Sequence, residues 1–105
     1  MLQKKTSEQG GLEFYIQTIH QYIPELKSKY SISSIGVFGS FVRREQLETS
    51  DIDILVDFEK PIGLFAFIEL EIKLSEYLGI KVDLVSKGSL QGRIGQAILS
   101  EVVYI

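Results

Sequence analysis

The stretch Gly39–Asp57, GSFVRREQLETSDIDILVD, decides the fold predicted for this chain. An apolar run, Ile35–Phe38, precedes it, and after a charged connector a second run alternates Asp51 and Asp53 with isoleucines. Because side chains of an extended strand alternate between its two faces, both aspartates are expected to project from the same face. The stretch therefore predicts a strand, a turn suited to phosphate, and a second strand carrying two neighbouring carboxylates.

The two carboxylates and the turn together indicate a particular kind of site. Carboxylates this close repel each other unless a cation lies between them or one of them takes up a proton. Mg²⁺ prefers such hard oxygen ligands and completes its octahedron with water and substrate phosphates. At the turn, Gly39 lets the backbone approach a phosphate closely, and the Ser40 hydroxyl with nearby N–H groups can donate to its oxygens. We therefore expect a site for a metal-bound nucleotide.

A third acid strengthens this expectation. The segment Lys81–Ser86, KVDLVS, reads as another short strand, with Asp83 between two apolar residues. A neighbouring strand can bring Asp83 beside Asp51 and Asp53. Three carboxylates can hold two metal ions, or one metal ion and an activated hydroxyl.

These residues resemble a known family, the minimal nucleotidyltransferases of the DNA polymerase beta superfamily. The resemblance rests on Gly39-Ser40, Arg43, the run Ser50-Asp51-Ile52-Asp53, and Asp83 in a Val-Asp-Leu strand. It covers nearly the whole chain.

The chain departs twice from the family motif Gly-Ser-x-Ala-Arg-Gly. Val42 replaces the alanine, which is a mild change, and Arg44 replaces the second glycine. If that position requires a positive φ, the arginine side chain carries a strain cost there.

The resemblance implies transfer of a nucleoside monophosphate, AMP from ATP in the first instance, to a hydroxyl group. Asp51 and Asp53 would bridge two Mg²⁺ ions to the triphosphate, and Asp83 would hold the metal at the acceptor. The phosphate-binding residues implied by the motif are Gly39, Ser40, Arg43 and Ser50. For Arg43 an equal alternative is a structural ion pair with a nearby carboxylate, and Ser50 can instead cap the connector.

The family also suggests a partner. Minimal nucleotidyltransferases are commonly the antitoxin of a HEPN-type toxin, and a toxin tyrosine is then the acceptor. Two alternatives stay open: a module of the same fold that neutralises its partner by contact alone, and a transferase acting on a small molecule such as an aminoglycoside. Substituting the aspartates by asparagine separates the first two, and a monomer in solution would count against the third.

Length and charge bound these hypotheses. A chain of 105 residues predicts one domain, assigned to residues 12–105 behind a polar tail, Met1–Gly11, that is expected to be flexible. The formal net charge of −3, without a basic run, argues against extended nucleic acid as substrate. The absence of cysteine excludes disulfides and thiolate metal sites. Without an apolar leader or spanning segment, a cytoplasmic protein is expected, and its oligomeric state stays open.

Apolar periodicity and turn residues predict an α/β (α+β) fold with a small mixed sheet. The first helix, starting at Leu12, is expected to break at Pro24. The long helix is expected to bury Leu64, Phe67, Ile68, Leu74 and Leu78, and the last helix Leu90, Ile94, Ala97 and Ile98. The only histidine, His20, is expected at the surface or at its boundary. The predicted elements are helices 12–22, 24–29, 64–78 and 89–101, a helical turn at 41–44, strands 34–38, 50–58 and 81–85, and an apolar end, 102–105, that is either a last strand or a docking segment.

Overall fold

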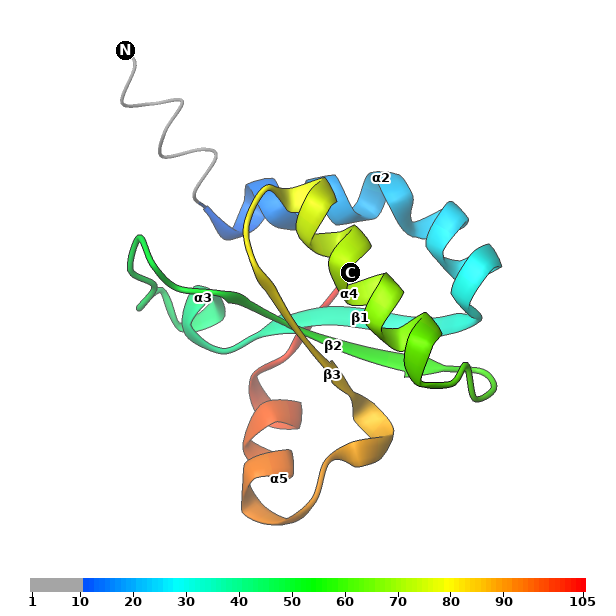
Figure 1. Cartoon of the computed structure of the whole chain (residues 1–105). Coiled ribbons are helices and arrows are strands. Elements are labelled where there is room, and N and C mark those ends of the chain that lie inside the picture. The colour runs from blue at the N-terminus through cyan, green and yellow to red at the C-terminus, as the bar shows by residue number, and fades with distance from the viewer. Residues whose placement is uncertain (1–10) are drawn as a thin grey trace.

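The computed structural model describes residues 11–105, so all but the last residue of the predicted tail lies outside the described part of the chain. Helices and strands alternate along it (Figure 1). The helices are α2 (Leu12–Tyr30), α3 (Ser40–Arg43), α4 (Leu64–Leu78) and α5 (Gly92–Glu101), with a single 3₁₀ turn, η1 (Lys87–Ser89); the strands are β1 (Ile32–Phe38), β2 (Ile52–Phe58), β3 (Val82–Ser86) and β4 (Val103–Tyr104).

The strands form one mixed sheet in the order β3-β2-β1-β4. Strand β1 is antiparallel to both β2 and β4, whereas β2 and β3 are parallel and are joined by the crossover helix α4. The predicted small mixed sheet packed with helices is confirmed. The apolar end of the chain forms a last strand, because β4 pairs with β1 at Gly36 and Val37.

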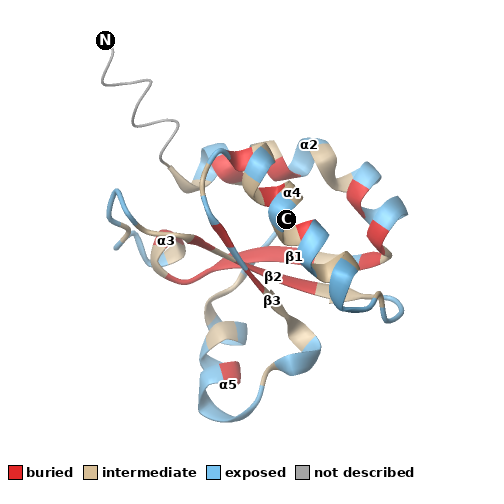
Figure 2. Ribbon diagram, viewed as in Figure 1, coloured by how far each residue is buried: buried red, intermediate tan, exposed pale blue. Residues whose placement is uncertain are grey.

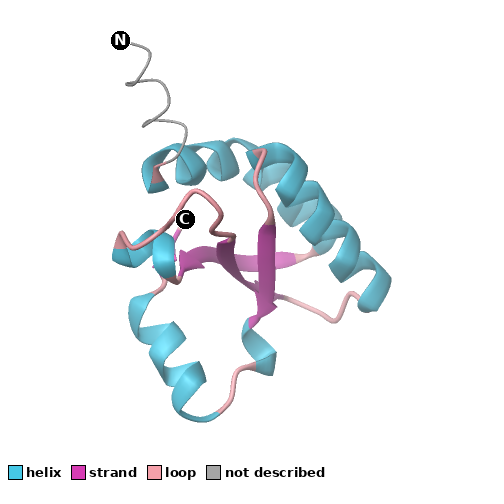
Figure 3. Ribbon diagram, turned by 60° about the vertical axis from the view of Figure 1, so that its left-hand side comes forward, coloured by secondary structure: helices cyan, strands magenta, loops and turns pink. Residues whose placement is uncertain are grey.

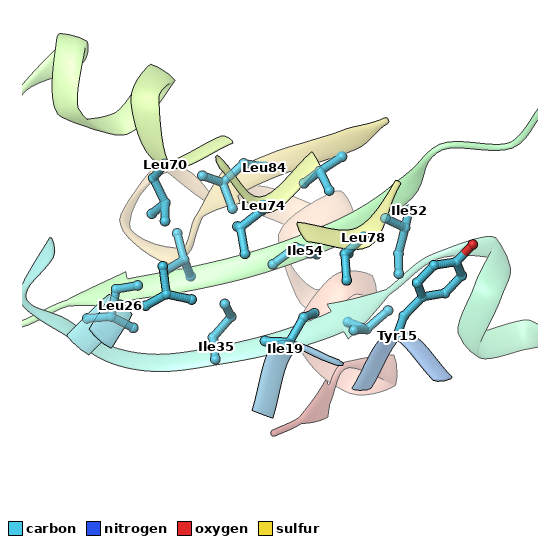
Figure 4. Packing of buried hydrophobic residues seen from close by; sticks show 14 of the residues in the cluster. Tyr15, Ile19, Leu26, Ile35, Ile52, Ile54, Leu70, Leu74, Leu78 and Leu84 are labelled. Atoms are coloured by element: carbon cyan, nitrogen blue, oxygen red, sulfur yellow. The ribbon is translucent and has the colours of Figure 1, made fainter. Parts of the chain in front are cut away.

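Helices α2 and α4 cover one face of this sheet, and Figure 3 shows how they lie across the strands. From β2, alternate residues Ile52, Ile54 and Val56 are fully buried against them. Figure 4 shows the result, with Ile19 of α2 and Leu74 of α4 meeting the sheet residues in one cluster. Burying each such side chain contributes roughly 1.5–3 kcal/mol, so this cluster is the main source of stability.

Proline 24 does not break the first helix, and that prediction was wrong. Helix α2 is continuous from Leu12 to Tyr30 with Pro24 inside it. Pro24 removes the hydrogen bond to the carbonyl of His20, but both residues are exposed, so water can solvate that carbonyl. Buried residues on both sides of the proline, Ile19 and Leu26, hold the helix on the sheet. Tertiary packing therefore overrides the local preference. The predicted surface position of His20 is confirmed.

Helix α4 begins and ends where predicted, but the side of the helix that is buried is only partly the one predicted. Leu70, Leu74 and Leu78 are buried, whereas Leu64 and Ile68, both expected inside, are 69% and 41% exposed. Periodicity identified an apolar helix but could not tell which of several apolar stripes faces the sheet. The C-cap is Gly79, which adopts the left-handed conformation with φ 68° that is common at helix ends.

Helix α5 lies on the other side of the sheet and covers little of it (Figures 1 and 2). Of the four residues predicted to face inward, Ile94 is 76% exposed, Ala97 is exposed, and Leu90 and Ile98 are only partly buried. The fully buried position is Gly95, against Leu90. The prediction of a buried face was wrong because the pairing of β4 ties only the C-terminal end of α5 to the sheet.

No helix between residues 11 and 105 is both long enough and apolar enough to cross a lipid bilayer.

Candidate active site

The turn after β1 places Gly39 against the carboxylate of β2. Phe38, the last residue of β1, is the register partner of Asp53. Gly39 then turns the chain into α3 with φ 83°, and a Cβ at this position would overlap the Asp53 carboxylate. Both the backbone conformation and the close approach therefore require glycine here. Gly39 and Asp53 belong to the same sequence motif, and in the structure they lie close together.

Asp53 and Asp83 lie side by side on the parallel strands β2 and β3. They are direct register partners, and neighbouring strands are roughly 4.8 Å apart. Both side chains project from the face opposite the main core, because their neighbours Ile52, Ile54 and Val82 are buried beneath α2 and α4. The predicted convergence of the third acid on the second is therefore observed.

The pKa of Asp53 is raised from its ordinary value to about 6. Burial of the carboxyl group is the largest cause, and the negative charges of Asp83 and Asp51 add to it. Arg43 acts in the opposite direction. Near neutral pH, Asp53 is thus an anion held in an environment that disfavours its charge, which is a common condition of functional carboxylates.

Asp51 lies just before β2 and is turned toward a lysine. Its Oδ2 is 3.8 Å from Nζ of Lys81, and both side chains are well exposed. Among residues 11–105, no three acidic or histidine side chains are arranged as a ready-made metal site. Asp53 and Asp83 are the assembled part of the predicted triad, and Asp51 would have to leave Lys81 to join them.

Arg43 is held by two carboxylates. Its Nε donates to Oε1 of Glu45 at 2.9 Å, and its Nη1 donates to the two carboxylate oxygens of Glu101 at 3.0 and 3.1 Å. These hydrogen bonds raise the pKa of Arg43 further. Of the two roles predicted for this residue, the structural ion pair is present.

The two serines of the motif differ in their surroundings. Ser50 closes the connector, because its hydroxyl accepts a hydrogen bond from the Leu47 N–H at 2.8 Å and its own N–H donates to the Leu47 carbonyl. This is the capping alternative. Ser40 begins α3, and within the described part of the chain its hydroxyl has no protein partner. It is thus available to a ligand.

Arg44, which stands where the family motif has glycine, adopts φ 61° at the C-cap of α3. The positive φ considered in the sequence analysis is therefore present. A non-glycine residue in this conformation carries a strain of about 1–2 kcal/mol. Its side chain points to Glu13 in an exposed contact of 3.6 Å, which stabilises little.

Two contacts of the site were missed by the sequence analysis. Lys81 was read only as the start of a strand, and Glu101 only as the end of a helix. The signal for Glu101 was present in the sequence: a carboxylate in the last turn of a helix faces the negative end of the helix dipole, and no basic residue accompanies it there.

Comparisons with known proteins agree with this geometry. The chain matches the model of the nucleotidyltransferase domain over residues 19–105. It is 51% identical over 90 residues to the protein adenylyltransferase MntA of Thermococcus cleftensis, a match that spans 86% of this chain and 89% of that relative. The chain therefore belongs to the nucleotidyltransferase family, and its homologues and structural neighbours are of the minimal nucleotidyltransferase kind.

Two solved structures extend the comparison to complexes. One is a toxin-antitoxin complex with AMP-PNP, 29% identical with a TM-score of 0.67, in which the match covers 80% of this chain and 69% of the other. The second is a tri-AMPylated HEPN toxin of Shewanella oneidensis in complex with its MNT antitoxin, 25% identical with a TM-score of 0.64, covering 86% and 70%.

Proposed function

We propose that this protein transfers AMP from ATP to a hydroxyl group of a partner protein in a Mg²⁺-dependent reaction, and that the partner is a HEPN-type toxin. The observation that carries the proposal is the convergence of Asp53, Asp83 and the Gly39 turn on one face of the sheet. The relative named a protein adenylyltransferase and the similarity to an antitoxin bound to an AMPylated toxin support the choice of acceptor.

The carboxylates fit a divalent cation. Asp53 is destabilised as an anion by burial and by two neighbouring carboxylates, and a bound cation would remove that repulsion. Asp51, Asp53 and Asp83 would hold Mg²⁺. To do so, Asp51 would break its ion pair with Lys81 and bind the metal instead. When bound, the metal would supply charge stabilisation at the transferring phosphoryl group and lower the pKa of the acceptor hydroxyl.

The phosphates would lie over the turn between β1 and α3. Ser40 is the clearest donor, because its hydroxyl has no partner within residues 11–105. Gly39 contributes the close approach of the backbone. Arg43 adds positive charge beside the turn, and Ser50 acts indirectly by fixing the connector that leads into Asp51.

The transfer itself forms one bond and breaks another. The acceptor oxygen attacks the α-phosphorus of ATP, the bond from that phosphorus to the bridging oxygen breaks, and pyrophosphate leaves. Asp83 lies on the edge strand β3 and is exposed, so a hydroxyl from another molecule can reach it. In this proposal Asp83 favours loss of the proton from the acceptor hydroxyl. Asp53, which is less exposed, would hold the metal that binds the nucleotide.

A second candidate function is neutralisation by contact alone. It is favoured by the exposed apolar side chains on α5 and β4, among them Ile94, Leu99 and Tyr104, which offer a surface to a partner. It is also favoured by the strained backbone at Arg44. The two functions differ in one respect: contact alone requires no carboxylate at positions 51 and 53.

The donor site is tested first, because that test requires no acceptor. Thermal unfolding is measured with and without ATP and Mg²⁺ for the wild type, for Asp53→Asn, and for Asp57→Asn as a matched control on the same face of β2. At ~100 times its dissociation constant, a ligand stabilises the folded state by roughly 2.7 kcal/mol, or several degrees in Tm. We expect this shift in the wild type and in the control, and none in Asp53→Asn.

The acceptor is then tested with the purified toxin and ATP labelled at either the α- or the γ-phosphate. Adenylylation transfers the α-label to the toxin and leaves the γ-label in pyrophosphate. Asp51→Asn with Asp53→Asn should abolish both labelling and neutralisation. Transfer of the γ-label would contradict the proposal, and neutralisation that survives the double substitution would establish the contact-only function.

A further inference from the structure

The carboxylate of Glu101 connects the phosphate turn to Arg43. One of its oxygens accepts the Gly39 N–H at 2.7 Å, and both oxygens lie within 3.1 Å of Arg43 Nη1. The Glu101 side chain is 23% exposed, so these contacts are partly shielded from water. Hydrogen bonds that involve charged groups are stronger than those between neutral groups.

The sheet itself brings Glu101 to this position. In the antiparallel pairing of β1 with β4, Gly36 faces Tyr104 and Val37 faces Val103. Because the pairing is antiparallel, the start of β4 lies beside the end of β1, and Glu101, two residues before β4, comes close to Gly39, which directly follows β1. Gly36 permits this close approach, because a Cβ there would lie 2.8 Å from the carbonyl oxygen of Val103. Glu101 is thus held by the same edge of the sheet that carries the phosphate turn.

Within its own helix, Glu101 lies at an unfavourable position for a carboxylate. It is the last residue of α5, where the helix dipole presents its negative end, and the last turn has no basic side chain. Its favourable partners come from outside the helix: the Gly39 N–H and Arg43. The contacts with those partners therefore offset the unfavourable position of this carboxylate at the end of the helix.

We propose that Glu101 is a positioning residue for the donor nucleotide, fixing the Gly39 turn and Arg43 in the arrangement that receives the triphosphate. The inference rests on the proposed function and adds a residue to its machinery. Without Glu101, the Gly39 N–H loses its partner, and Arg43 keeps only the exposed Glu45, whose side chain is 64% exposed. Both the turn and the guanidinium would then sample orientations that do not bind phosphate.

The test compares Glu101→Ala and Glu101→Gln with the wild type, and uses Glu45→Gln as the matched control. Glutamine keeps an oxygen that can accept the Gly39 N–H, but it loses the ion pair with Arg43; Glu45→Gln changes Arg43 without touching the turn. The dissociation constant of ATP with Mg²⁺ is obtained from the ligand-induced rise in Tm. The KM values for ATP and for the acceptor protein are then measured separately in the transfer reaction.

We expect Glu101→Ala to weaken ATP binding about tenfold or more, since it removes charge-assisted hydrogen bonds. Glu101→Gln should bind ATP more tightly than Glu101→Ala but more weakly than the wild type. Glu45→Gln should change the dissociation constant of ATP less than threefold. The KM for ATP should rise while the KM for the acceptor stays unchanged, a split that general loosening of the fold would not produce. If Glu101→Ala does not fold, the test rests on Glu101→Gln, for which we expect ATP affinity to fall at least threefold.

Two results would overturn the inference. Unchanged ATP affinity in the folded variants would make Glu101 a purely structural residue. Tighter binding would mean that its carboxylate competes with phosphate for the Gly39 N–H and Arg43. These outcomes are distinct from failure of the proposed function, because in that case the wild type itself would bind no nucleoside triphosphate with Mg²⁺.

Discussion

The two faces of strand β2 differ in what they contribute to the protein. Toward α2 and α4, Ile52, Ile54 and Val56 are completely buried in a continuous apolar cluster. On the other face, one residue away along the same strand, Asp53 lies beside Asp83 and has a pKa of about 6. One face is wholly apolar and stabilises the fold, whereas the other combines one buried leucine, Leu55, with like charges that are held together at a cost.

This difference indicates how one strand can hold closely spaced carboxylates and still fold. The repulsion among the carboxylates is tolerated because the opposite face of the same strands is anchored by hydrophobic burial. The apo protein is therefore expected to be less stable than its core alone would make it, and ligand binding is expected to recover part of that loss. Substitutions of the buried isoleucines and of the carboxylates should therefore have opposite effects on the free energy of unfolding.

The largest effect is expected on the buried face. Ile54→Ala should lower the free energy of unfolding by about 2–5 kcal/mol, because it removes buried methyl groups and leaves a cavity in a fully packed site. Denaturant unfolding at 25 °C measures this loss. The dissociation constant of ATP with Mg²⁺, measured where the variant is still folded, should stay within about twofold of the wild type; a loss below 1 kcal/mol would contradict the assignment of this face as the core.

The opposite sign is expected on the carboxylate face. Asp53→Asn removes a disfavoured charge, so it should raise the stability of the ligand-free protein at pH 7 by about 1 kcal/mol, after allowance for solvent screening of a partly exposed group. The matched variant Asp57→Asn, on the same face away from Asp83, should change stability by less than about 0.5 kcal/mol. A destabilised Asp53→Asn would mean that the carboxylate cluster is not a source of strain.

The dependence on pH follows from the same residue. The pKa of Asp53 is higher in the folded protein, about 6, than the unfolded value of 3.8. The folded state therefore binds the proton more tightly, and its stabilising effect is complete below the unfolded pKa and is lost as the pH rises through 6. Unfolding curves from pH 4 to 7 should show this loss in the wild type relative to Asp53→Asn. If the difference between the two proteins is independent of pH, the raised pKa is contradicted.

The smallest effect is expected outside both faces, at the left-handed residue that follows α3. Arg44→Gly should raise stability by about 0.5–1 kcal/mol, because glycine relieves the strain at φ 61° but has more freedom in the unfolded chain. Ser31→Gly, at φ 57° after α2 and away from the site, is the matched control and should give a similar gain. If only Arg44→Gly also tightens ATP binding, then the arginine at this position distorts the phosphate turn.

Much of the site was predictable from the sequence because its determinants are local. The alternation in Ser50–Asp57 sets Asp53 apart from Ile52 and Ile54, and Gly39 follows an apolar strand at a fixed distance. The parallel register that brings Asp83 to Asp53 was expected from a third short apolar strand, and the structure supplies its alignment. Apolar periodicity together with turn residues also predicted the limits of α4.

Other features depended on contacts between segments distant in sequence. The continuity of α2 through Pro24, the buried stripe of α4 and the exposure of α5 are each decided by the surface on which the helix packs. The pairing of Asp51 with Lys81 and of Arg43 with Glu101 likewise depends on where the strands end. The sequence by itself determined the strand alternation, the glycine turn and the carboxylates proposed to be catalytic, because these follow from residue type and short spacing. Only the tertiary structure decided which faces are covered, because that depends on how the helices pack on the sheet. It alone also decided how Glu101 reaches Gly39, because that depends on the pairing of β1 with β4, more than sixty residues apart.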